Sequence, residues 1–265
     1  MSHLLPPFPN EPEFRRFLAP TLIARGRCAD VYHAYDGLTG LEVAVKILNE
    51  TARRDGTEAE RFLHGAALQS RIRHAQVLPI YDAWNSGSAT AQVMAYAPMG
   101  TLQAYLDRVG SIPLPRAVIW ARELCHGVAA VHDAGVVHGD LKPLNLLLNG
   151  AEQIWISDFG EARAFDDPLP PQPQPIINGS PYYMAPECAR GYAPDSASDR
   201  YNVGVILYRL FSGRLPFVGA DAETVMRMQV DSMPVDPRVH RPDIPEFAVR
   251  FILGLLAKDP RRRLT

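Results

Sequence analysis

Four polar residues in the middle of this 265-residue chain have the types and spacing needed to handle a phosphate group. Asp140, Lys142 and Asn145 lie within six positions of one another, and Asp158 follows 18 residues after Asp140. A carboxylate can orient a hydroxyl nucleophile, an ammonium group can neutralise a phosphate, and an amide with a second carboxylate can bind a metal ion. Phosphoryl transfer depends on such positioning and charge neutralisation, so these residues predict a phosphoryl-transfer site.

The sequence around these residues resembles the catalytic loop and the metal motif of protein kinases, H-R-D-x-K-x-x-N and D-F-G. The chain reads HGDLKPLN from residue 138 and DFG from residue 158, so that Gly139 replaces the family's arginine. The resemblance implies that Asp140 accepts the proton of the substrate hydroxyl and that Lys142 neutralises the transferring phosphate of ATP. Asn145 and Asp158 would hold Mg²⁺, with Mn²⁺ as the alternative ion. The lysine-proline pair in the loop is typical of the serine/threonine class, here of the bacterial type.

The same resemblance implies a set of nucleotide-binding positions. Lys46 ends the run VAVK and matches the strand lysine that contacts the α and β phosphates. The family's glycine-rich loop keeps only its middle glycine, which predicts a stiffer phosphate clamp. The implied ATP-binding residues are Ala24, Gly26, Val31, Ala44, Lys46, Met94 as gatekeeper, Ala95 and Ala97 through their backbones, and Leu147.

Lys46 lacks the helix glutamate that the family provides as its partner. The register of the run RFLHGA against R-F-x-x-E-A places Gly65 at the glutamate position, and a glycine inside a helix costs about 1 kcal/mol. Gln69, one turn further along the helix, or Glu161, after the metal motif, could reach Lys46 instead. The substitution leaves open a second reading, a pseudokinase that binds a nucleotide or a partner with little or no transfer activity.

The run GSPYYMAPE at residues 179–187 resembles the substrate platform of protein kinases. The resemblance implies that Ser180 hydrogen-bonds Asp140 and Lys142 and shapes this platform. A platform of this kind favours protein substrates with serine or threonine acceptors over the small molecules that related kinases phosphorylate. The structural residues that the resemblance implies are Glu187 paired with Arg263, and Asp199 as the anchor of the catalytic loop.

The segment before this platform contains no acceptor for a phosphate. Residues 161–178 include no Ser, Thr or Tyr, and Gly139 lacks the side chain that would bind a phosphate there. We therefore expect activity without phosphorylation of this segment. The prolines between Pro168 and Pro175 favour an extended polyproline II conformation. They predict a stiff spacer, with docking of an SH3-like partner as the alternative.

The apolar pattern predicts two lobes. Short alternating runs across residues 18–96 predict an antiparallel sheet that one helix, near residues 58–71, interrupts. Spacings of three and four then predict helices over residues 115–134, 198–211, 221–230 and 245–256. The expected fold is α+β: the bilobal protein kinase fold, with a small antiparallel β-sheet lobe (18–96) and a larger, mainly helical lobe (97–265). We expect residues 1–17 to be a leader that need not be structured, and the kinase domain (18–265) to stop before its last helix.

Composition limits the classes of partner. A formal net charge of -2 and a pI near 6.4 give no electrostatic support for binding nucleic acid or a membrane. The three cysteines are widely spaced, which predicts reduced thiols rather than disulfides. No apolar run is long enough for a signal peptide or a membrane helix. The sequence therefore predicts a soluble, cytoplasmic protein.

Overall fold

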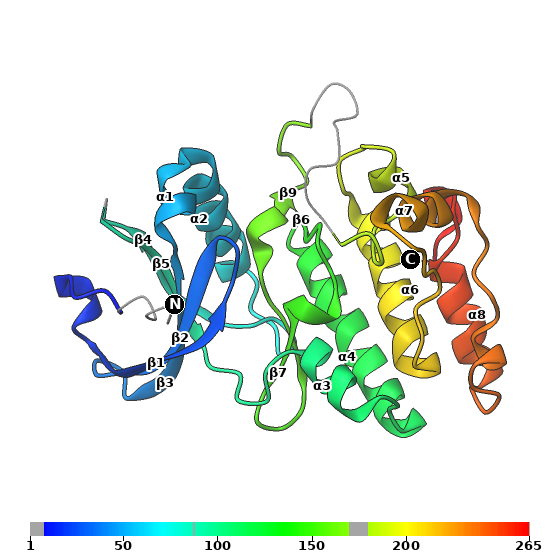
Figure 1. Cartoon of the computed structure of the whole chain (residues 1–265), viewed down its shortest axis with the longest axis horizontal. Helices are drawn as coiled ribbons and strands as arrows, with labels where there is room; N and C mark the ends of the chain where they lie inside the picture. Colours follow the sequence, from blue (N-terminus) through cyan, green and yellow to red (C-terminus); the bar gives the residue numbers. More distant parts are fainter. Residues whose placement is uncertain (1–7, 87, 170–179, 265) are drawn as a thin grey trace.

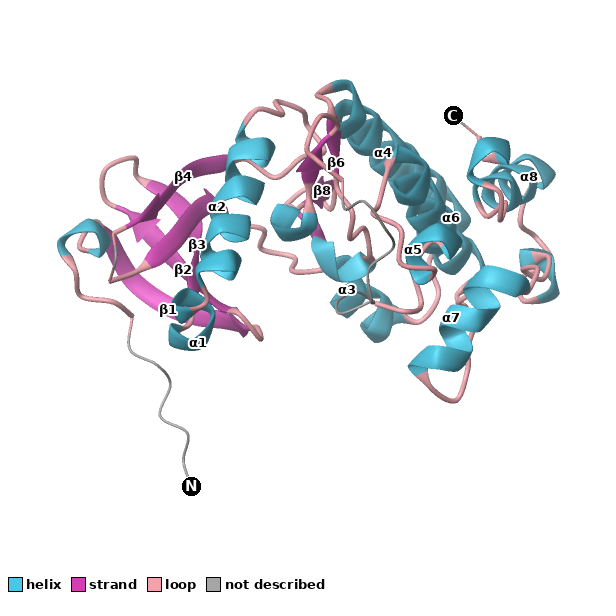
Figure 2. Ribbon diagram, turned by 90° about the horizontal axis from the view of Figure 1, so that it is seen from above, coloured by secondary structure: helices cyan, strands magenta, loops and turns pink. Residues whose placement is uncertain are grey.

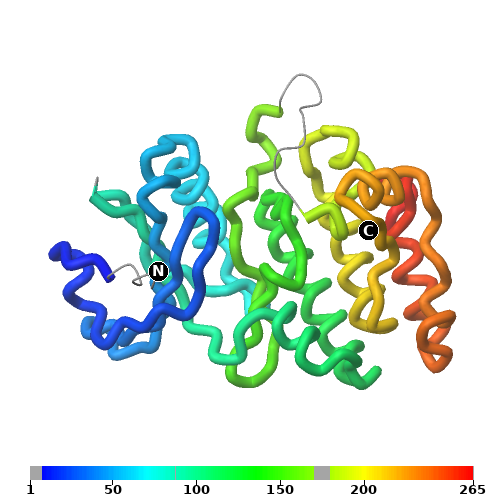
Figure 3. The backbone as a smooth tube through the Cα atoms, in the orientation of Figure 1, coloured from blue at the N-terminus to red at the C-terminus, as the bar shows by residue number. Residues whose placement is uncertain are grey.

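A sheet-based lobe and a larger helical lobe lie side by side in the computed structural model, which describes residues 8–86, 88–169 and 180–264 (Figure 1). The first third of the chain forms the smaller lobe, and the chain then continues into the larger one (Figure 3). Helices fill the larger lobe, whereas the sheet dominates the smaller one (Figure 2). The site residues of the sequence analysis are divided between the two lobes.

Five antiparallel strands form the sheet of the smaller lobe, in the order β1-β2-β3-β5-β4. They are β1 (Phe17–Arg25), β2 (Ala29–Asp36), β3 (Leu41–Leu48), β4 (Ile80–Asn85) and β5 (Thr90–Ala95). All six residues of β5 are buried, as expected for a strand covered on both faces. Because β3 pairs with both β2 and β5, Lys46 is fixed in register opposite Gln92 of β5.

Two capped helices follow β3, namely α1 (Glu50–Arg54) and α2 (Gly56–Ser70). Side chains that accept hydrogen bonds from the first turn start each helix, Asn49 for α1 and Asp55 for α2. The side-chain amide of Gln92 in β5 donates a 2.6 Å hydrogen bond to the carbonyl of Phe62 in α2. This buried bond ties α2 to the sheet.

The described residues of the larger lobe form six helices, five of which contribute to one apolar core. The six helices are α3 (Leu102–Val109), α4 (Leu114–Asp133), α5 (Pro186–Ala189), α6 (Ser196–Ser212), α7 (Ala222–Asp231) and α8 (Glu246–Leu255). α6 is buried along most of its length and lies in contact with α4 and α8. A reciprocal capping box between Asp195 and Ser198 begins α6, and Gly213 ends it at φ 74°.

Short strands and turns carry the polar residues of the catalytic loop and the metal motif between the two lobes. β6 (Val136–Val137) pairs with β9 (Arg163–Ala164), and β7 (Leu146–Leu148) pairs with β8 (Ile154–Ile156). The 3-10 turns are η1 (Pro12–Phe14), η2 (Pro143–Asn145), η3 (Phe159–Glu161), η4 (Pro237–Val239) and η5 (Pro260–Arg262). The catalytic loop runs from β6 to β7, and the metal motif follows β8.

The predicted bilobal α+β fold is confirmed, and every predicted helix is present with ends displaced by at most two residues. The sequence analysis missed α1, α3 and α5, which are short, and the edge strand β4. All three cysteines are free thiols, as expected. In the described part of the chain, no helix has both the length and the apolar character needed to span a membrane.

Residues 8–17, which were expected to belong to a leader, pack against the sheet. The ring of Phe14 is 1% exposed and lies 5.4 Å from that of Trp84 in β4, and the ring of Phe8 lies 5.0 Å from that of Tyr32 in β2. Burying aromatic rings is strongly favourable, and it outweighs the extended bias of the surrounding prolines. Residues 1–7 lie outside the described part of the chain.

Candidate active site

The backbone of the catalytic loop is fastened to α6 by one buried carboxylate. Asp199 is 0% exposed and accepts hydrogen bonds from the backbone N–H groups of His138 (2.8 Å) and Gly139 (2.9 Å). Nε2 of His132, at the end of α4, lies 2.9 Å from the same carboxylate. Three partners satisfy a carboxylate that would otherwise be costly to bury, so the loop is held in one geometry.

Three side chains of the loop bind one another. The ammonium group of Lys142 lies 2.6 Å from Oδ2 of Asp140. The amide nitrogen of Asn145 donates to that same oxygen at 3.0 Å and to the carbonyl of Asp140 at 2.8 Å. The structure therefore brings together the three residues that the sequence analysis selected here, with the Asp140 carboxylate oriented by two donors.

Gly139 occupies a backbone conformation that few other residues adopt. Its φ is +78°, and a Cβ placed on it would lie 2.8 Å from the carbonyl oxygen of Glu161 and 3.2 Å from Cγ of Pro194. Both the left-handed conformation and the lack of space favour glycine here. The departure from the family's arginine is thus built into the local backbone.

Lys46 is paired with the carboxylate of the metal motif. Its ammonium group lies 2.8 Å from Oδ1 of Asp158 and 5.7 Å from the centre of the Phe62 ring in α2. This charge holds the pKa of Asp158 below its usual value, against the partial loss of water around the carboxylate. Asp158 has a left-handed backbone (φ 62°, ψ 70°), which is uncommon for a residue with a side chain.

Neither of the two possible partners that the sequence analysis named for Lys46 binds it. Gln69 is 3% exposed and donates a 2.8 Å hydrogen bond to the carbonyl of Leu78. Glu161 makes no ion pair with Lys46, and loss of water around its carboxyl group raises its pKa while the charge of Arg61 opposes that rise. Of the possible partners for Lys46, the structure selects neither Gln69 nor Glu161, because the ammonium group is bound to Asp158.

The implied adenine-pocket residues come together in one place. Ala44, Met94 and Ala95 form a buried cluster with Leu78, and Val31 and Leu147 pack against it. The cluster combines residues of β2, β3 and β5 from the smaller lobe with β7 from the larger lobe. Its members are all apolar, as the lining of a site for a base would be.

The loop between β1 and β2 is a tight turn at Gly26. The N–H of Gly26 donates to the carbonyl of Ala29 at 2.8 Å, and a Cβ on Gly26 would lie 2.8 Å from that oxygen. Ala24 pairs with Val31 across the two strands. Among the implied hinge residues, Ala97 accepts a 3.1 Å hydrogen bond from the N–H of Gly100. In the turn between β1 and β2, the backbone leaves no room for a Cβ at Gly26, so this position favours glycine.

The donors for a metal ion are few and hard. Asp158 could supply a carboxylate, and Asn145 could supply an amide oxygen because its amide nitrogen is already bound to Asp140. No group of three His, Cys, Asp or Glu side chains in the described residues could hold a metal by itself. One carboxylate and one amide oxygen fit Mg²⁺, which keeps places for water and phosphate oxygens.

The substrate-platform residues do not all make the expected contacts. Ser180 forms no hydrogen bond to Asp140 or Lys142 in the described structure, and its carbonyl accepts from the N–H of Tyr183 at 3.0 Å. The hydrogen bonds expected from Ser180 are therefore not formed, and Asp140 and Lys142 bind each other instead. Residues 170–179 are outside the described part of the chain, so the expected polyproline segment is described only at Pro168 and Leu169, both exposed.

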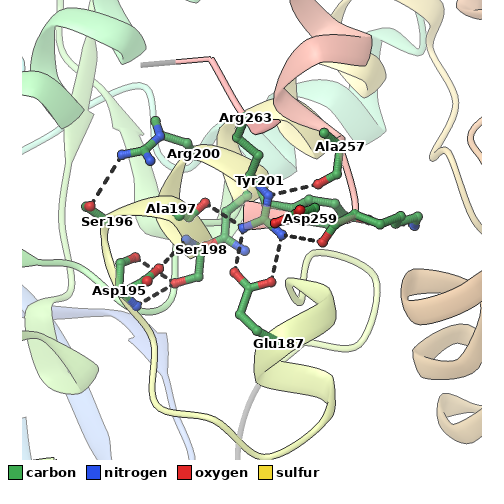
Figure 4. Close-up of polar contacts among 12 residues, drawn as sticks. Glu187, Asp195, Ser196, Ala197, Ser198, Arg200, Tyr201, Ala257, Asp259 and Arg263 are labelled. Carbon is green, nitrogen blue, oxygen red and sulfur yellow. Dashed lines mark hydrogen bonds and ion pairs between the residues drawn. The ribbon is translucent and has the colours of Figure 1, made fainter. Parts of the chain in front are cut away.

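Glu187 and Arg263 form the expected ion pair (Figure 4). The guanidinium donates to both carboxylate oxygens, at 2.5 and 2.6 Å, in the bidentate geometry that suits arginine. Arg263 is 4% exposed. It also donates to three backbone carbonyls, those of Ala197, Ala257 and Lys258. The pair joins α5 to the end of the chain.

Two histidines near the site have contacts that the sequence analysis did not anticipate. His132 binds Asp199, and His138 lies with Nε2 3.0 Å from the carbonyl of Ser157 and its ring 4.7 Å from that of Phe159. His138 thereby links the catalytic loop to the metal motif. For His138 the available signal was its place in the loop motif, and for His132 it was only the position at the end of a predicted helix.

Comparison with known proteins agrees with this geometry. Residues 19–265 match the protein kinase domain. The DNA damage-responsive serine/threonine-protein kinase RqkA of Deinococcus radiodurans is 34% identical over 253 residues, which cover 94% of this chain and 37% of that protein. The serine/threonine-protein kinase PrkC of Bacillus subtilis is 30% identical over 248 residues, 94% of this chain and 38% of PrkC. The serine/threonine-protein kinase PknA of Mycobacterium tuberculosis is 32% identical over 253 residues, 94% of this chain and 58% of PknA. The chain thus spans less than two fifths of the length of RqkA and PrkC.

Proposed function

The chain belongs to the protein kinase domain family, and on that premise we propose that it transfers the γ-phosphoryl group of Mg-ATP to serine or threonine hydroxyls of protein substrates. The observation that carries the proposal is the hydrogen-bonded set of Asp140, Lys142 and Asn145 on a loop that Asp199 fastens to the core. Unrelated surface charges would not be oriented by so many specific bonds. Lys46 and Asp158 supply the opposite charges that a metal-nucleotide complex needs.

Each residue has a defined part in the proposed reaction. Asp140 orients the acceptor hydroxyl and takes its proton, while Lys142 offsets negative charge on the phosphoryl group as it moves. Asn145 and Asp158 would hold Mg²⁺, which would neutralise charge on the phosphate oxygens. Lys46 exchanges its bond to Asp158 for one to the phosphates. Ala44, Met94 and Leu147 enclose the adenine.

A direct test is phosphorylation of a generic protein substrate, such as casein, by the chain with Mg-ATP. Asp140→Asn should lower turnover at least about a hundredfold, because the amide cannot accept the hydroxyl proton. Nucleotide affinity should change little, since Asp140 does not contact the adenine cluster. Radiolabelled phosphate incorporation measures the first quantity, and calorimetric titration with Mg-ADP measures the second. Equal turnover by both proteins would remove Asp140 from the reaction.

One observation favours a second candidate, a pseudokinase that binds nucleotide or a partner. Lys46 is bound to the metal carboxylate itself, and α2 presents Gly65 where the family has an acid. A chain locked in this state would bind nucleotide without aligning its phosphates. Nucleotide binding without any phosphate incorporation, in both the wild type and Asp140→Asn, would establish this candidate in place of the first.

We further propose that activity needs no phosphate on residues 161–178. Gly139 has neither the side chain nor the backbone conformation for the family's arginine. In the described part of the segment, hydrogen bonds to the rest of the chain fix the backbone without a phosphate. Arg163 donates to the carbonyl of Pro194 at 2.9 Å, and the N–H of Phe165 donates to Gly135 at 2.7 Å.

Phosphatase-treated protein should accordingly begin phosphorylating its substrate without a lag. The expectation follows from the lack of any Ser, Thr or Tyr in residues 161–178. Progress curves from treated and untreated protein, checked by mass spectrometry for residual phosphate, provide the measurement. A lag that disappears as Ser180 or Tyr182 becomes phosphorylated would contradict the proposal.

A further inference from the structure

Gly65 is the point at which α2 touches the metal motif. A Cβ built on Gly65 would lie 2.2 Å from the carbonyl oxygen of Phe159, 2.7 Å from its carbonyl carbon and 3.2 Å from the nitrogen of Gly160. These neighbours are backbone atoms, so they cannot move aside as the end of a flexible side chain could. No residue with a side chain fits at this position while α2 keeps its place. Only a glycine allows the helix to lie directly on this peptide.

The peptide beneath Gly65 controls the residue before it. The carbonyl of Phe159 accepts a 3.0 Å hydrogen bond from the N–H of Ala162, which closes the turn η3. Asp158 precedes this turn with a left-handed backbone. A residue with a side chain stays in that conformation only where its surroundings hold it there. The ring of Phe159, 2% exposed, holds one side of the turn, and α2 covers its peptide.

The acid that binds Lys46 lies on the turn after β8 and not on α2, whose Arg61 acts instead on Glu161. Lys46 binds Asp158, and α2 offers Lys46 only the face of Phe62. The helix therefore acts on Asp158 through close packing at Gly65, without an ion pair to Asp158. A second contact joins the same two segments, because Nε2 of His64 lies 3.3 Å from Oδ2 of Asp167, which also accepts the N–H of Ala164. Successive residues of α2 thus meet both ends of residues 158–167.

We infer that Gly65 is a positioning residue: its missing side chain seats α2 on the Phe159–Gly160 peptide and thereby holds the Asp158 carboxylate where a metal-nucleotide complex needs it. The inference rests on the proposed function and gives the departure from the family's glutamate a role. The replacement of glutamate by glycine does more than remove an ion pair with Lys46. A glutamate introduced here would collide with the turn before it could reach Lys46.

A pair of glycines in α2 provides a matched comparison. Gly56 is the first residue of the helix and has nothing within 4 Å of its Cβ position, so alanine fits there. Gly65→Ala and Gly56→Ala change the same helix in the same way, but only the first meets the turn. The affinity of each protein for a fluorescent ADP analogue is measured with and without Mg²⁺. The ratio of the two affinities reports how well Asp158 is placed for the metal.

Gly65→Ala should reduce the Mg²⁺-dependent gain in affinity by about tenfold or more, a typical cost of disturbing a group that positions a metal ligand. Affinity for the analogue without Mg²⁺ should change less, and Gly56→Ala should match the wild type in both. Gly65→Glu should be no better than Gly65→Ala. An unchanged Mg²⁺ ratio in Gly65→Ala would overturn the inference, as would a gain in Gly65→Glu.

Wild-type protein provides a second measurement in case Gly65→Ala does not fold. Binding of Mg-ADP should slow hydrogen exchange at the amides of residues 60–69, because α2 and the turn after Asp158 move together. Unchanged exchange in α2 on binding would overturn the inference. Both tests measure nucleotide binding rather than turnover, so they apply equally to a protein that transfers no phosphate. A wild-type chain that binds no Mg-ADP would overturn the proposed function and the inference together.

Discussion

Asp158→Asn is expected to lower Mg²⁺-dependent phosphoryl transfer by about a thousandfold or more. The substitution removes the only carboxylate among the proposed metal ligands, and preorganised charge of this kind contributes on the order of a thousandfold to turnover. It also removes the charge that binds Lys46 at 2.8 Å. The measurement is radiolabelled phosphate incorporation at saturating Mg-ATP, with calorimetric titration to separate binding from turnover.

Asp166→Asn provides the matched control for this prediction. Asp166 is an exposed aspartate eight positions further along, and the described structure gives it no hydrogen bond or ion pair. The control should keep wild-type turnover. Undiminished transfer by Asp158→Asn would show that the metal is held elsewhere, and equal losses in both variants would indicate a general effect of charge on the segment.

Arg263→Ala is expected to lower the free energy of unfolding by about 3–5 kcal/mol. Breaking a buried ion pair on one side leaves the other charge without compensation. Here the substitution would leave the Glu187 carboxylate and the carbonyls of Ala197, Ala257 and Lys258 without the donor that Arg263 provides. Urea unfolding followed by circular dichroism gives the free energy for the wild type and the variant.

Arg261→Ala tests whether this loss belongs to the buried pair. The side chain of Arg261 is 88% exposed and pairs with Asp259 at 2.9 Å. Exposed pairs contribute about 0–1 kcal/mol, so this variant should unfold close to the wild type. Similar losses of unfolding free energy in the two variants would mean that the buried pair with Glu187 contributes no more than an exposed pair.

The grouping of site residues that are close in sequence was predictable, because their spacing along the chain limits how far apart they can lie. Asp140, Lys142 and Asn145 share one loop, and the structure joins them by hydrogen bonds. The strand and helix patterns were predictable for a related reason, since periodicity reports which face is buried. The short helices α1, α3 and α5 were missed because four to eight residues carry little periodic signal.

Contacts between distant segments could not be read from spacing. Which side chain binds Lys46 depends on the distance between α2 and β3, and that distance cannot be derived from the sequence. Gly65 was noticed only as a missing acid, because its role depends on the approach of the Phe159 peptide. Residues 8–17 were assigned to a leader on their prolines, although Phe14 anchors them to Trp84. In each case the outcome was decided by close packing.

The left-handed backbone at Gly139 also limits how this protein can evolve. A single change to arginine would introduce the family's phosphate receptor at a position where the Cβ meets the carbonyl of Glu161. Relieving that collision would pull the Gly139 N–H away from Asp199, to which it donates at 2.9 Å. The first step toward control by phosphorylation would therefore weaken the catalytic loop before any benefit appeared. Such a control would have to arise by several changes at once, or elsewhere on the molecule.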